Sequence, residues 1–348
     1  MQTTIIGTKD NFLATKEEFF NILRMVAPGT NLRSALNGIV DAKKGALIVI
    51  DKDNIAPLID GGFKINCRFT PQRLIELSKM DGAIILSKDI KRIIYANVTL
   101  APDTKIPTKE TGTRHKAAER TAKSIGTLAI AISERKNEIN LYYKNLKYHL
   151  RNTSEILRSA TETLQILEKQ KELFDRNLEK LDYLELNGKV DIKQACRVIQ
   201  NGKAIEKILE SQERTFIELG NEALPLRLRV KEIANSVPYE TDLVIKDYAL
   251  FNYKKSQELI DEMSYEDLND LSKIEKALGQ NESNYLDEPV KGWRILSKTV
   301  FSEKEIALLL SHFNNLRNIL NSGPEKFKEV LGEEKSRLFE IELNKIIS

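Results

Sequence analysis

Cysteine and histidine are scarce in this chain, whose 348 residues include two cysteines and three histidines. The cysteines, Cys67 and Cys196, lie in what we expect to be different domains, so a disulfide between them is not expected. So low a cysteine count is typical of a reducing cytoplasm, which is where we expect this protein to work. Because no ligand spacing links these few side chains, a structural zinc site is not expected either.

Long apolar runs are also missing. No stretch approaches the roughly 20 apolar residues that a membrane-spanning helix needs, so no membrane partner is expected. Residues 1–7 lack the basic and then apolar layout of a secretory signal. A strong charge of one sign is absent too, because the formal net charge is only +3. That value neither demands nor excludes a nucleic-acid partner.

The first part of the chain, residues 1–148, mixes helix and strand signals, and we expect an α/β domain with a mixed sheet. A composition of 41% hydrophobic and 30% charged residues fits a globular protein, and the length allows about two or three domains. In this first domain, helices are expected over 15–27, 32–42, 70–79 and 117–125, and strands over 46–51, 83–87, 92–100, 127–133 and 138–143.

The rest of the chain carries helical signals alone, so the predicted fold class is α/β followed by all-α domains. Over 149–290, apolar residues such as Ile156, Leu164 and Phe174 recur at helical spacing among Lys and Glu, which predicts a helical bundle or spine. A coiled-coil rod would need strict heptads, and the spacing drifts instead. Residues 291–348 form a last unit that begins near Trp293.

The most informative stretch is Glu110–Arg120, in which Gly112 and Thr113 precede Arg114, His115 and Lys116 directly before a segment suited to a helix. Amide groups at a helix start favour anions, and cationic side chains beside them add charge-assisted donors. An ordinary helix start with a solvated basic turn is the alternative, but positive charge there opposes the helix dipole. The residues alone leave both possibilities open, with a polyphosphate as the ligand of the first.

A second stretch, Lys79–Ser87, places Asp81-Gly82-Ala83 directly before a buried-strand pattern. Together with Gly112–Lys116, this stretch resembles the diadenylate cyclase family, whose members condense two ATP into cyclic di-AMP. Asp-Gly is also a common tight turn, which would be the interpretation of Asp81 and Gly82 in isolation. Further stretches agree with the family in the same order along the chain, namely Val26–Thr30, Gly45–Ile50, Asp60–Phe63, Tyr95–Leu100 and Ile130–Arg135.

The resemblance implies a set of site residues. Asp81 would lie near the attacking 3′-hydroxyl and bind Mg²⁺ or Mn²⁺, and with Arg114 and His115 it would form the catalytic group. The residues expected to bind ATP are Gly82, Leu100, Thr113, Arg114, His115, Lys116, Ala117 and Ser133. The resemblance also implies two ATP per pair of facing domains, within a homo-oligomer that is an octamer in this family.

The chain departs from the family pattern in the phosphate-binding stretch and in the C-terminal hairpin. The family usually has Arg where this chain has Lys116, and Thr where it has Ala117, so one bidentate phosphate donor and one hydroxyl are absent. Members that signal DNA damage end in a helix-hairpin-helix module with a glycine-rich turn, whereas only Gly332 is present here, followed by Glu333 and Glu334. Acidic and basic residues balance beyond Lys298, so we expect weak DNA binding.

Three functions are therefore compared. The favoured one is a diadenylate cyclase on an oligomeric scaffold with a DNA-scanning tail. The alternatives are a DNA-binding scanner with residual nucleotide chemistry, and a nucleotide sensor with reduced cyclase activity, which Lys116 and Ala117 would favour. The cyclase motifs are nearly complete, whereas the hairpin turn keeps one glycine of the glycine-rich family pattern. This difference indicates an enzyme rather than a scanner.

Overall fold

The computed structural model describes residues 13–52, 55–189, 192–250, 252–279 and 290–347. The chain divides into two compact units, of which the first comprises Met1–Ala160 with Glu213–Pro225. The second comprises Thr161–Gln212 and Leu226–Ser348. Within the described ranges, no helix has the length and apolar character that crossing a membrane requires, and no disulfide joins Cys67 to Cys196.

The first unit is built around an eight-stranded mixed sheet with the strand order β2-β5-β4-β1-β6-β7-β8, and β3 also pairs with β5. Strands β1 and β4 run parallel, and the other pairs are antiparallel. The strand bounds are β1 Ala46–Ile50, β2 Ile59–Asp60, β3 Phe63–Arg68, β4 Ala83–Leu86, β5 Arg92–Leu100, β6 Leu128–Ser133, β7 Glu138–Tyr143 and β8 Leu146–Leu150. The predicted mixed α/β fold of this part of the chain is confirmed.

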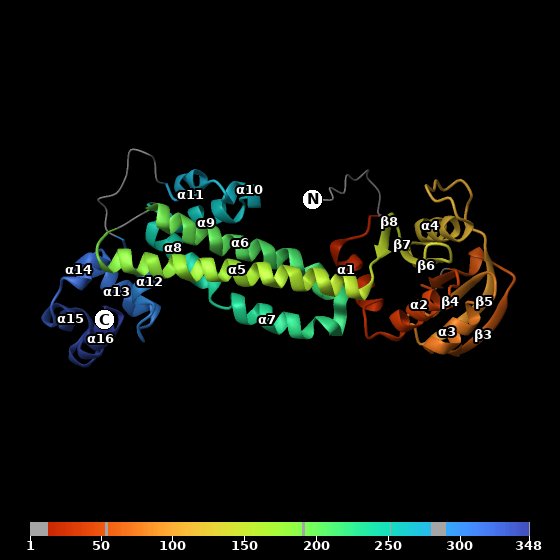
Figure 1. Cartoon of the computed structure of the whole chain (residues 1–348), viewed down its shortest axis with the longest axis horizontal. Helices are drawn as coiled ribbons and strands as arrows, with labels where there is room; N and C mark the ends of the chain where they lie inside the picture. The colour runs from red at the N-terminus through yellow and green to blue at the C-terminus, as the bar shows by residue number, and fades with distance from the viewer. Residues whose placement is uncertain (1–12, 53–54, 190–191, 251, 280–289, 348) are drawn as a thin grey trace. The chain divides into compact units, whose positions relative to one another are not determined.

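Helices cover both faces of the sheet (Figure 1). Helix α4, Thr113–Ile125, packs on one face through Ala118 and Ala122. Helices α2, Asn31–Asp41, and α3, Pro71–Leu77, contribute to the core on the other face. The central strands are buried on both faces because of these two layers, which explains their continuous apolar sequences.

The first unit also contains helix α1 and two short 3-10 helices. Helix α1, Lys16–Met25, begins at a capping box formed by Thr15 and Glu18. It packs against Ile217 near the end of helix α6, Ile192–Leu219, through Phe20 and Leu23. The short helices are η1, Ala56–Leu58, and η2, Gly220–Ala223.

Two differences from the sequence prediction concern this unit. Helix α4 begins at Thr113 rather than at 117, so the basic stretch is its first turn and not a loop before it. Strands β2, β3 and β8 were not predicted, although the sequence of the largely exposed β3 alternates apolar and polar residues. Residue 148, the predicted end of the first domain, lies within β8, and the domain bounds stay a prediction.

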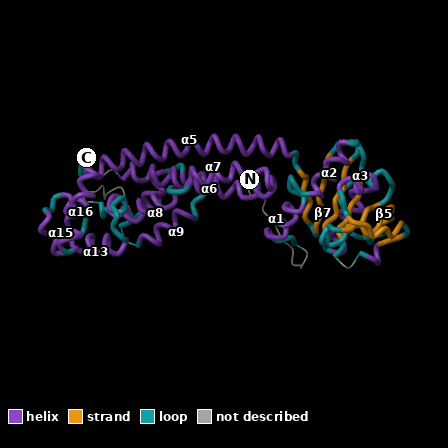
Figure 2. The backbone as a smooth tube through the Cα atoms, turned by 90° about the horizontal axis from the view of Figure 1, so that it is seen from below, coloured by secondary structure: helices purple, strands orange, loops and turns teal. Residues whose placement is uncertain are grey.

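The second unit is helical throughout its described part, as Figure 2 shows by the confinement of strands to the first unit. The helices from α5 onward are α5 Thr153–Leu186, α6 Ile192–Leu219, α7 Leu224–Ala234, α8 Val237–Tyr248, α9 Tyr253–Asp261, α10 Tyr265–Leu268, α11 Leu271–Ala277, α12 Trp293–Leu296, α13 Glu303–Phe313, α14 Leu316–Leu320, α15 Pro324–Leu331 and α16 Glu333–Ile347. The apolar positions at helical spacing face one shared core, which includes Leu167, Phe174 and Leu181 of α5. The predicted helical character of this region is confirmed.

The last helices, α13 to α16, enclose a separate small core around Phe301, Phe327 and Phe339, whose rings meet edge to face. Helices α15 and α16 are joined through Gly332, whose φ of +80° suits glycine. The predicted boundary between 290 and 291 directly follows residues 280–289, which lie outside the described ranges.

A buried ionic cluster fixes the short helix α12. The side chain of Arg294 is completely buried, and its guanidinium pairs with Asp182 and, at 2.5 Å, with Oε2 of Glu185. Both carboxylate oxygens of Asp247 accept backbone N–H groups at the start of α12, from Gly292 at 2.9 Å, Trp293 at 2.7 Å and Arg294 at 2.9 Å. Such a cluster is stable only while each charge keeps its partners.

Candidate functional site

Several strand ends meet at one edge of the sheet in the first unit. In the parallel pair of β1 and β4, Leu47 lies opposite Ala83, so Gly45 and Asp81 precede the two strands side by side. In the antiparallel pair of β1 and β6, Ala46 lies opposite Ile132, which brings Ser133 next to Gly45. The register therefore lines up Asp81 and Ser133, which are far apart in the sequence, along the same edge.

The side chain of Asp81 is fully exposed at this edge. Its Oδ1 lies 3.9 Å from Nη2 of Arg114, the second residue of α4, and Arg114 itself is partly exposed. At that distance the two charges attract each other only weakly across solvent. Both are consequently available to a charged ligand.

Two glycines allow the backbone to approach closely here. Gly82 has φ of +86°, and a Cβ there would lie 2.8 Å from the backbone carbonyl carbon of Asn97 in β5. A Cβ on Gly45 would lie 2.6 Å from Nη1 of Arg114 and 3.2 Å from the carbonyl oxygen of Ile132. Since Arg114 occupies the space that a side chain on residue 45 would take, Gly45 helps to determine where the guanidinium lies.

Helix α4 starts without a conventional cap. Its N-cap residue, Gly112, has no side chain to accept a hydrogen bond from the first turn, and that turn contains no acidic residue. It contains Thr113, Arg114, His115 and Lys116 instead. The backbone N–H groups of this first turn, which have no side-chain cap, therefore lie beside the basic side chains of Arg114, His115 and Lys116. This arrangement suits a polyphosphate.

His115 is half-buried and directed toward the sheet. Its Nδ1 lies 3.0 Å from the hydroxyl oxygen of Tyr142, a buried residue of β7. Burial lowers the pKa of His115 from its ordinary value, an effect that Glu110 partly opposes. Burial also raises the pKa of Tyr142, which stays a neutral phenol.

The other predicted site residues lie on the same face of the sheet or at its edge. Leu100, at the end of β5, and Ala117, in α4, both pack against the core between α4 and the sheet. Ser133 ends β6, and its Oγ accepts a hydrogen bond of 3.3 Å from the backbone N–H of Lys136. We find the predicted residues distributed over β4, β5, β6 and α4, with Asp81 and Arg114 as the pair that an ionic contact joins.

The donor set fits a divalent ion that is shared with phosphate. Among the described residues, no group of three or more His, Cys, Asp or Glu side chains is arranged to hold a metal by itself. Asp81 offers one exposed carboxylate. Mg²⁺ commonly binds one or two carboxylates together with substrate phosphates and water, which one aspartate at a phosphate-binding edge can satisfy.

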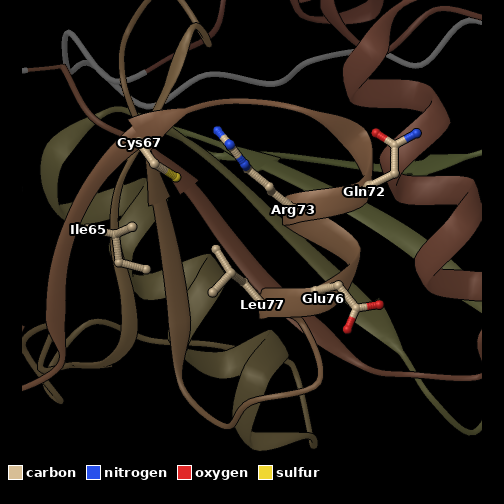
Figure 3. A pocket seen from close by; sticks show the side chains of 6 residues that line it. All are labelled: Ile65, Cys67, Gln72, Arg73, Glu76 and Leu77. Carbon is tan, nitrogen blue, oxygen red and sulfur yellow. The ribbon is translucent and has the colours of Figure 1, made fainter.

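A separate apolar groove lies between β3 and α3 (Figure 3). Ile65, Cys67 and Leu77 line it, with Arg73 and Glu76 at its border. No predicted site residue lines this groove, so it is not part of the candidate site.

Sequence reasoning missed three residues that the structure brings to the site. Gly45 was noted only as part of a stretch that agrees with the family, although Arg114 lies against it. Tyr142 and Glu110 were given no role, and both interact with the elements around His115. A tyrosine in the middle of a buried strand is a signal of its own, because its hydroxyl needs a partner there.

Two family models match this chain. Residues 33–146 match the DisA bacterial checkpoint controller nucleotide-binding model, and residues 150–286 match the DisA bacterial checkpoint controller linker region. All the predicted site residues lie within the first match.

Curated relatives are similar along nearly the whole chain. A protein from Acetivibrio thermocellus is 40% identical over 332 residues, which cover 92% of each chain. One from Clostridium perfringens is 39% identical over 338 residues, covering 95% of this chain and 96% of the relative. One from Symbiobacterium thermophilum is 39% identical over 329 residues, covering 92% and 93%. Each of the three is named DNA integrity scanning protein DisA.

Proposed function

The chain belongs to the DisA family and is a diadenylate cyclase, and we propose that Asp81 and the first turn of α4 form its nucleotide site. The observation that carries this proposal is the position of the exposed Asp81 carboxylate 3.9 Å from Arg114, beside a helix start that has no cap. A carboxylate next to an anion-binding turn supplies both functions that joining two nucleotides requires.

The reaction forms a bond between each 3′-oxygen and the α-phosphorus of the other nucleotide, and it breaks the bond from that phosphorus to the leaving pyrophosphate. The amides of the first turn of α4, with Arg114, His115 and Lys116, hold the triphosphate. Asp81 orients the attacking hydroxyl. Positioning and electrostatic stabilisation supply most of the barrier reduction in such transfers. Asp81 would hold Mg²⁺ or Mn²⁺, and such an ion would supply positive charge against the charge that develops on the phosphate oxygens.

We propose that the working unit is a pair of facing first domains. One domain presents one ATP, and the hydroxyl that attacks it belongs to the ATP of another copy. The family resemblance extends this pairing to an octamer, and ATP as substrate agrees with a cytoplasmic location. An isolated monomer is inactive on this proposal.

The experiment that tests the function is incubation of the purified chain with ATP and either Mg²⁺ or Mn²⁺, followed by separation of the products. We expect cyclic di-AMP and two pyrophosphates per product, with a specific activity that falls as the protein is diluted below its association range. Binding of ATP without any product would indicate the alternative, a nucleotide sensor.

Lys116→Arg is expected to tighten ATP binding while kcat stays close to that of the wild type. Arg offers a planar fork to phosphate oxygens, and one added charge-assisted bond is worth about 1 kcal/mol, or roughly a fivefold lower KM. Steady-state kinetics measures both constants. Lys123→Arg is the matched control, because Lys123 lies in the last turn of α4 and pairs with Glu119 at 2.6 Å. A large loss of activity in Lys116→Arg would show that the site is adapted to lysine.

We propose further that α15, Gly332 and α16 form a helix-hairpin-helix that binds DNA weakly. Basic side chains at this hairpin are paired with acids: Nζ of Lys328 lies 3.3 Å from Glu333, Arg337 lies 3.4 Å from the same carboxylate, and Lys335 lies 2.6 Å from Glu305. Charges that are already neutralised release few counterions when DNA binds.

We therefore expect the affinity for a four-way DNA junction to be weak, and to be similar to the affinity for a matched linear duplex at each salt concentration of a titration. Substitution of both Glu333 and Glu334 by lysine should strengthen binding and steepen its salt dependence, because it removes like charge from the hairpin. The same double substitution at Glu340 and Glu342, farther along α16, is the control for net charge. Tight binding that prefers the junction at physiological salt in the wild type would refute this prediction.

A further inference from the structure

The loop that joins β5 to α4, residues 101–112, is held against the middle of α4 by hydrogen bonds. The hydroxyl of Thr108 donates to Oε2 of Glu119. Nε of the next helical residue, Arg120, donates to the backbone carbonyl oxygen of Ile106 at 3.1 Å. Two successive residues of the helix therefore bind the loop that leads into its own first turn.

The carboxylate of Glu119 is suited to hold the loop. Its side chain is 14% exposed, and its Oε1 pairs at 2.6 Å with Nζ of Lys123, which also donates to the carbonyl oxygen of Pro107 at 2.9 Å. Burial alone would raise the pKa of Glu119, but hydrogen bonds from Lys123 and Thr108 outweigh that effect and lower the pKa. The carboxylate is therefore ionised near pH 7, and a hydrogen bond to a charged group is stronger than one between neutral groups. The pairing needs a cation at position 123, which Lys123→Arg preserves.

Thr108 connects Glu119 to the last part of the loop. A hydroxyl has one proton and two lone pairs, so after donating to Glu119 its oxygen accepts the backbone N–H of Glu110 at 3.1 Å. The carboxylate of Glu110, whose side chain is 16% exposed, pairs with Nζ of Lys147 in β8 at 2.5 Å. Glu110 is thus anchored at both its amide and its side chain, only two residues before Gly112, the N-cap of α4.

The first turn of α4 needs this support because it is weak by itself. It has no side-chain cap at Gly112 and no acidic residue, and the basic residues Arg114, His115 and Lys116 oppose the helix dipole. A helix end of this kind frays easily. The loop contacts fix the chain just ahead of the turn and do not cap its N–H groups, so those groups stay available to an anion.

We infer that Glu119, acting through Thr108, is a positioning residue that keeps the first turn of α4 folded before a nucleotide binds. The inference rests on the proposed function for the identity of the ligand, a nucleoside triphosphate. A turn that is already formed does not have to be ordered during binding, so more of the free energy of the phosphate contacts is retained as affinity. Neither Glu119 nor Thr108 is among the residues expected to bind ATP.

Thr108→Val tests the inference in the full chain, because it removes the hydroxyl and keeps the size and the branched shape of the side chain. Thr108→Ser restores the hydroxyl and should behave like the wild type. Ser87→Ala is the matched control. The Ser87 hydroxyl, in the turn after β4, donates to Oδ1 of Asp89 at 2.7 Å and accepts the N–H of Arg92 at 3.0 Å, so its loss removes the same two kinds of bond at another turn.

Hydrogen exchange followed by mass spectrometry measures the opening of residues 113–116. We expect their amides to exchange at least about tenfold faster in nucleotide-free Thr108→Val than in the wild type, the usual effect of losing one hydrogen bond to a charged group. Saturation with 3′-deoxy-ATP, which lacks the attacking hydroxyl, should restore slow exchange because the phosphates then hold the turn. Thr108→Ser and Ser87→Ala should exchange like the wild type.

Steady-state kinetics separates positioning from chemistry. We expect KM for ATP and Kd for 3′-deoxy-ATP to rise about tenfold in Thr108→Val while kcat stays within about twofold, since bound nucleotide completes the turn. Glu119→Ala should show the same division between KM and kcat. In a double-mutant cycle the effects of Thr108→Val and Glu119→Ala on Kd should be less than additive, because both remove one contact. A role in folding alone would reduce the amount of folded protein and leave KM unchanged.

Equal exchange of residues 113–116 in Thr108→Val and in the wild type would overturn the inference, and so would a Thr108→Ser variant as impaired as Thr108→Val. A loss of kcat at unchanged KM would overturn it too. Faster exchange together with an unchanged affinity for 3′-deoxy-ATP would support the hold of Glu119 and Thr108 on the turn, and would instead contradict the place of the phosphates there. The failure of the inference and the failure of the proposed function are thus distinguishable.

Discussion

Asp81→Asn should abolish the formation of cyclic di-AMP while the protein keeps its fold and its oligomeric state. The carboxylate is fully exposed and its ionic contact with Arg114 is 3.9 Å long, so folding does not depend on it. Asn keeps the shape and removes the charge that orients the hydroxyl or binds the divalent ion. A loss of at least about 100-fold in kcat is expected for a group that acts directly on the reacting atoms.

The measurement is product formation by chromatography, with oligomer size checked by analytical ultracentrifugation. Asp89→Asn serves as the control, because Asp89 is an exposed aspartate in the turn after β4, at the opposite end of that strand, where it accepts a hydrogen bond from Ser87. Turnover like that of the wild type in Asp81→Asn would remove this residue from the catalytic group.

Arg294→Leu is expected to destabilise the helical unit by about 3–5 kcal/mol, the usual cost of removing one partner from a buried ion pair. The substitution leaves Glu185 buried without its cation, with the hydroxyl of Tyr248 still donating to it at 3.0 Å. Trp293, the single tryptophan of the chain, is the neighbour of Arg294 and reports unfolding of this region in urea by its fluorescence. Arg317→Leu, at an exposed position of α14, should change the transition little.

The loss in Arg294→Leu should depend on pH. Burial already raises the pKa of Glu185 to about 7 in the wild type, and removal of the arginine raises it further. A carboxyl with a raised pKa in the folded state costs stability as the pH rises from its unfolded value through its folded value. The variant should therefore lose more stability at pH 8 than at pH 5.5. A loss below about 1 kcal/mol at both values would contradict a structural role for the cluster.

The sequence predicted the central strands well because they are buried on both faces and therefore read as continuous apolar runs. The start of α4 was placed too late, since Arg114, His115 and Lys116 oppose the helix dipole and look unsuited to a first turn. Strand β3 was missed although its apolar residues Phe63, Ile65 and Cys67 alternate with polar ones, and of the residues of β3 only Ile65 and Cys67 are partly buried. Continuous apolar runs thus indicate strands buried on both faces more clearly than a short alternating segment indicates an exposed strand.

Parts of the site were beyond sequence reasoning for a different reason. The motifs identified Asp81 and Arg114, but the approach of Arg114 to Gly45 follows from the packing of α4 against β1, which no single segment encodes. The contact of His115 with Tyr142 likewise joins α4 to β7, and the ion pair of Glu110 with Lys147 joins the loop before α4 to β8. The assignment of the site residues to ATP stays a prediction.

Gly112 leaves the first turn of α4 without a side-chain acceptor, and this has a thermodynamic meaning for the whole first unit. On the proposed function, a nucleotide phosphate that accepts those N–H groups would complete the secondary structure, and the substrate would then act as a removable part of the fold. Ligand that binds only the folded state stabilises it by about 2.7 kcal/mol when free ligand is about 100 times Kd. The enzyme would then be hardest to unfold and to digest when ATP is plentiful, and most vulnerable to proteases when ATP runs low.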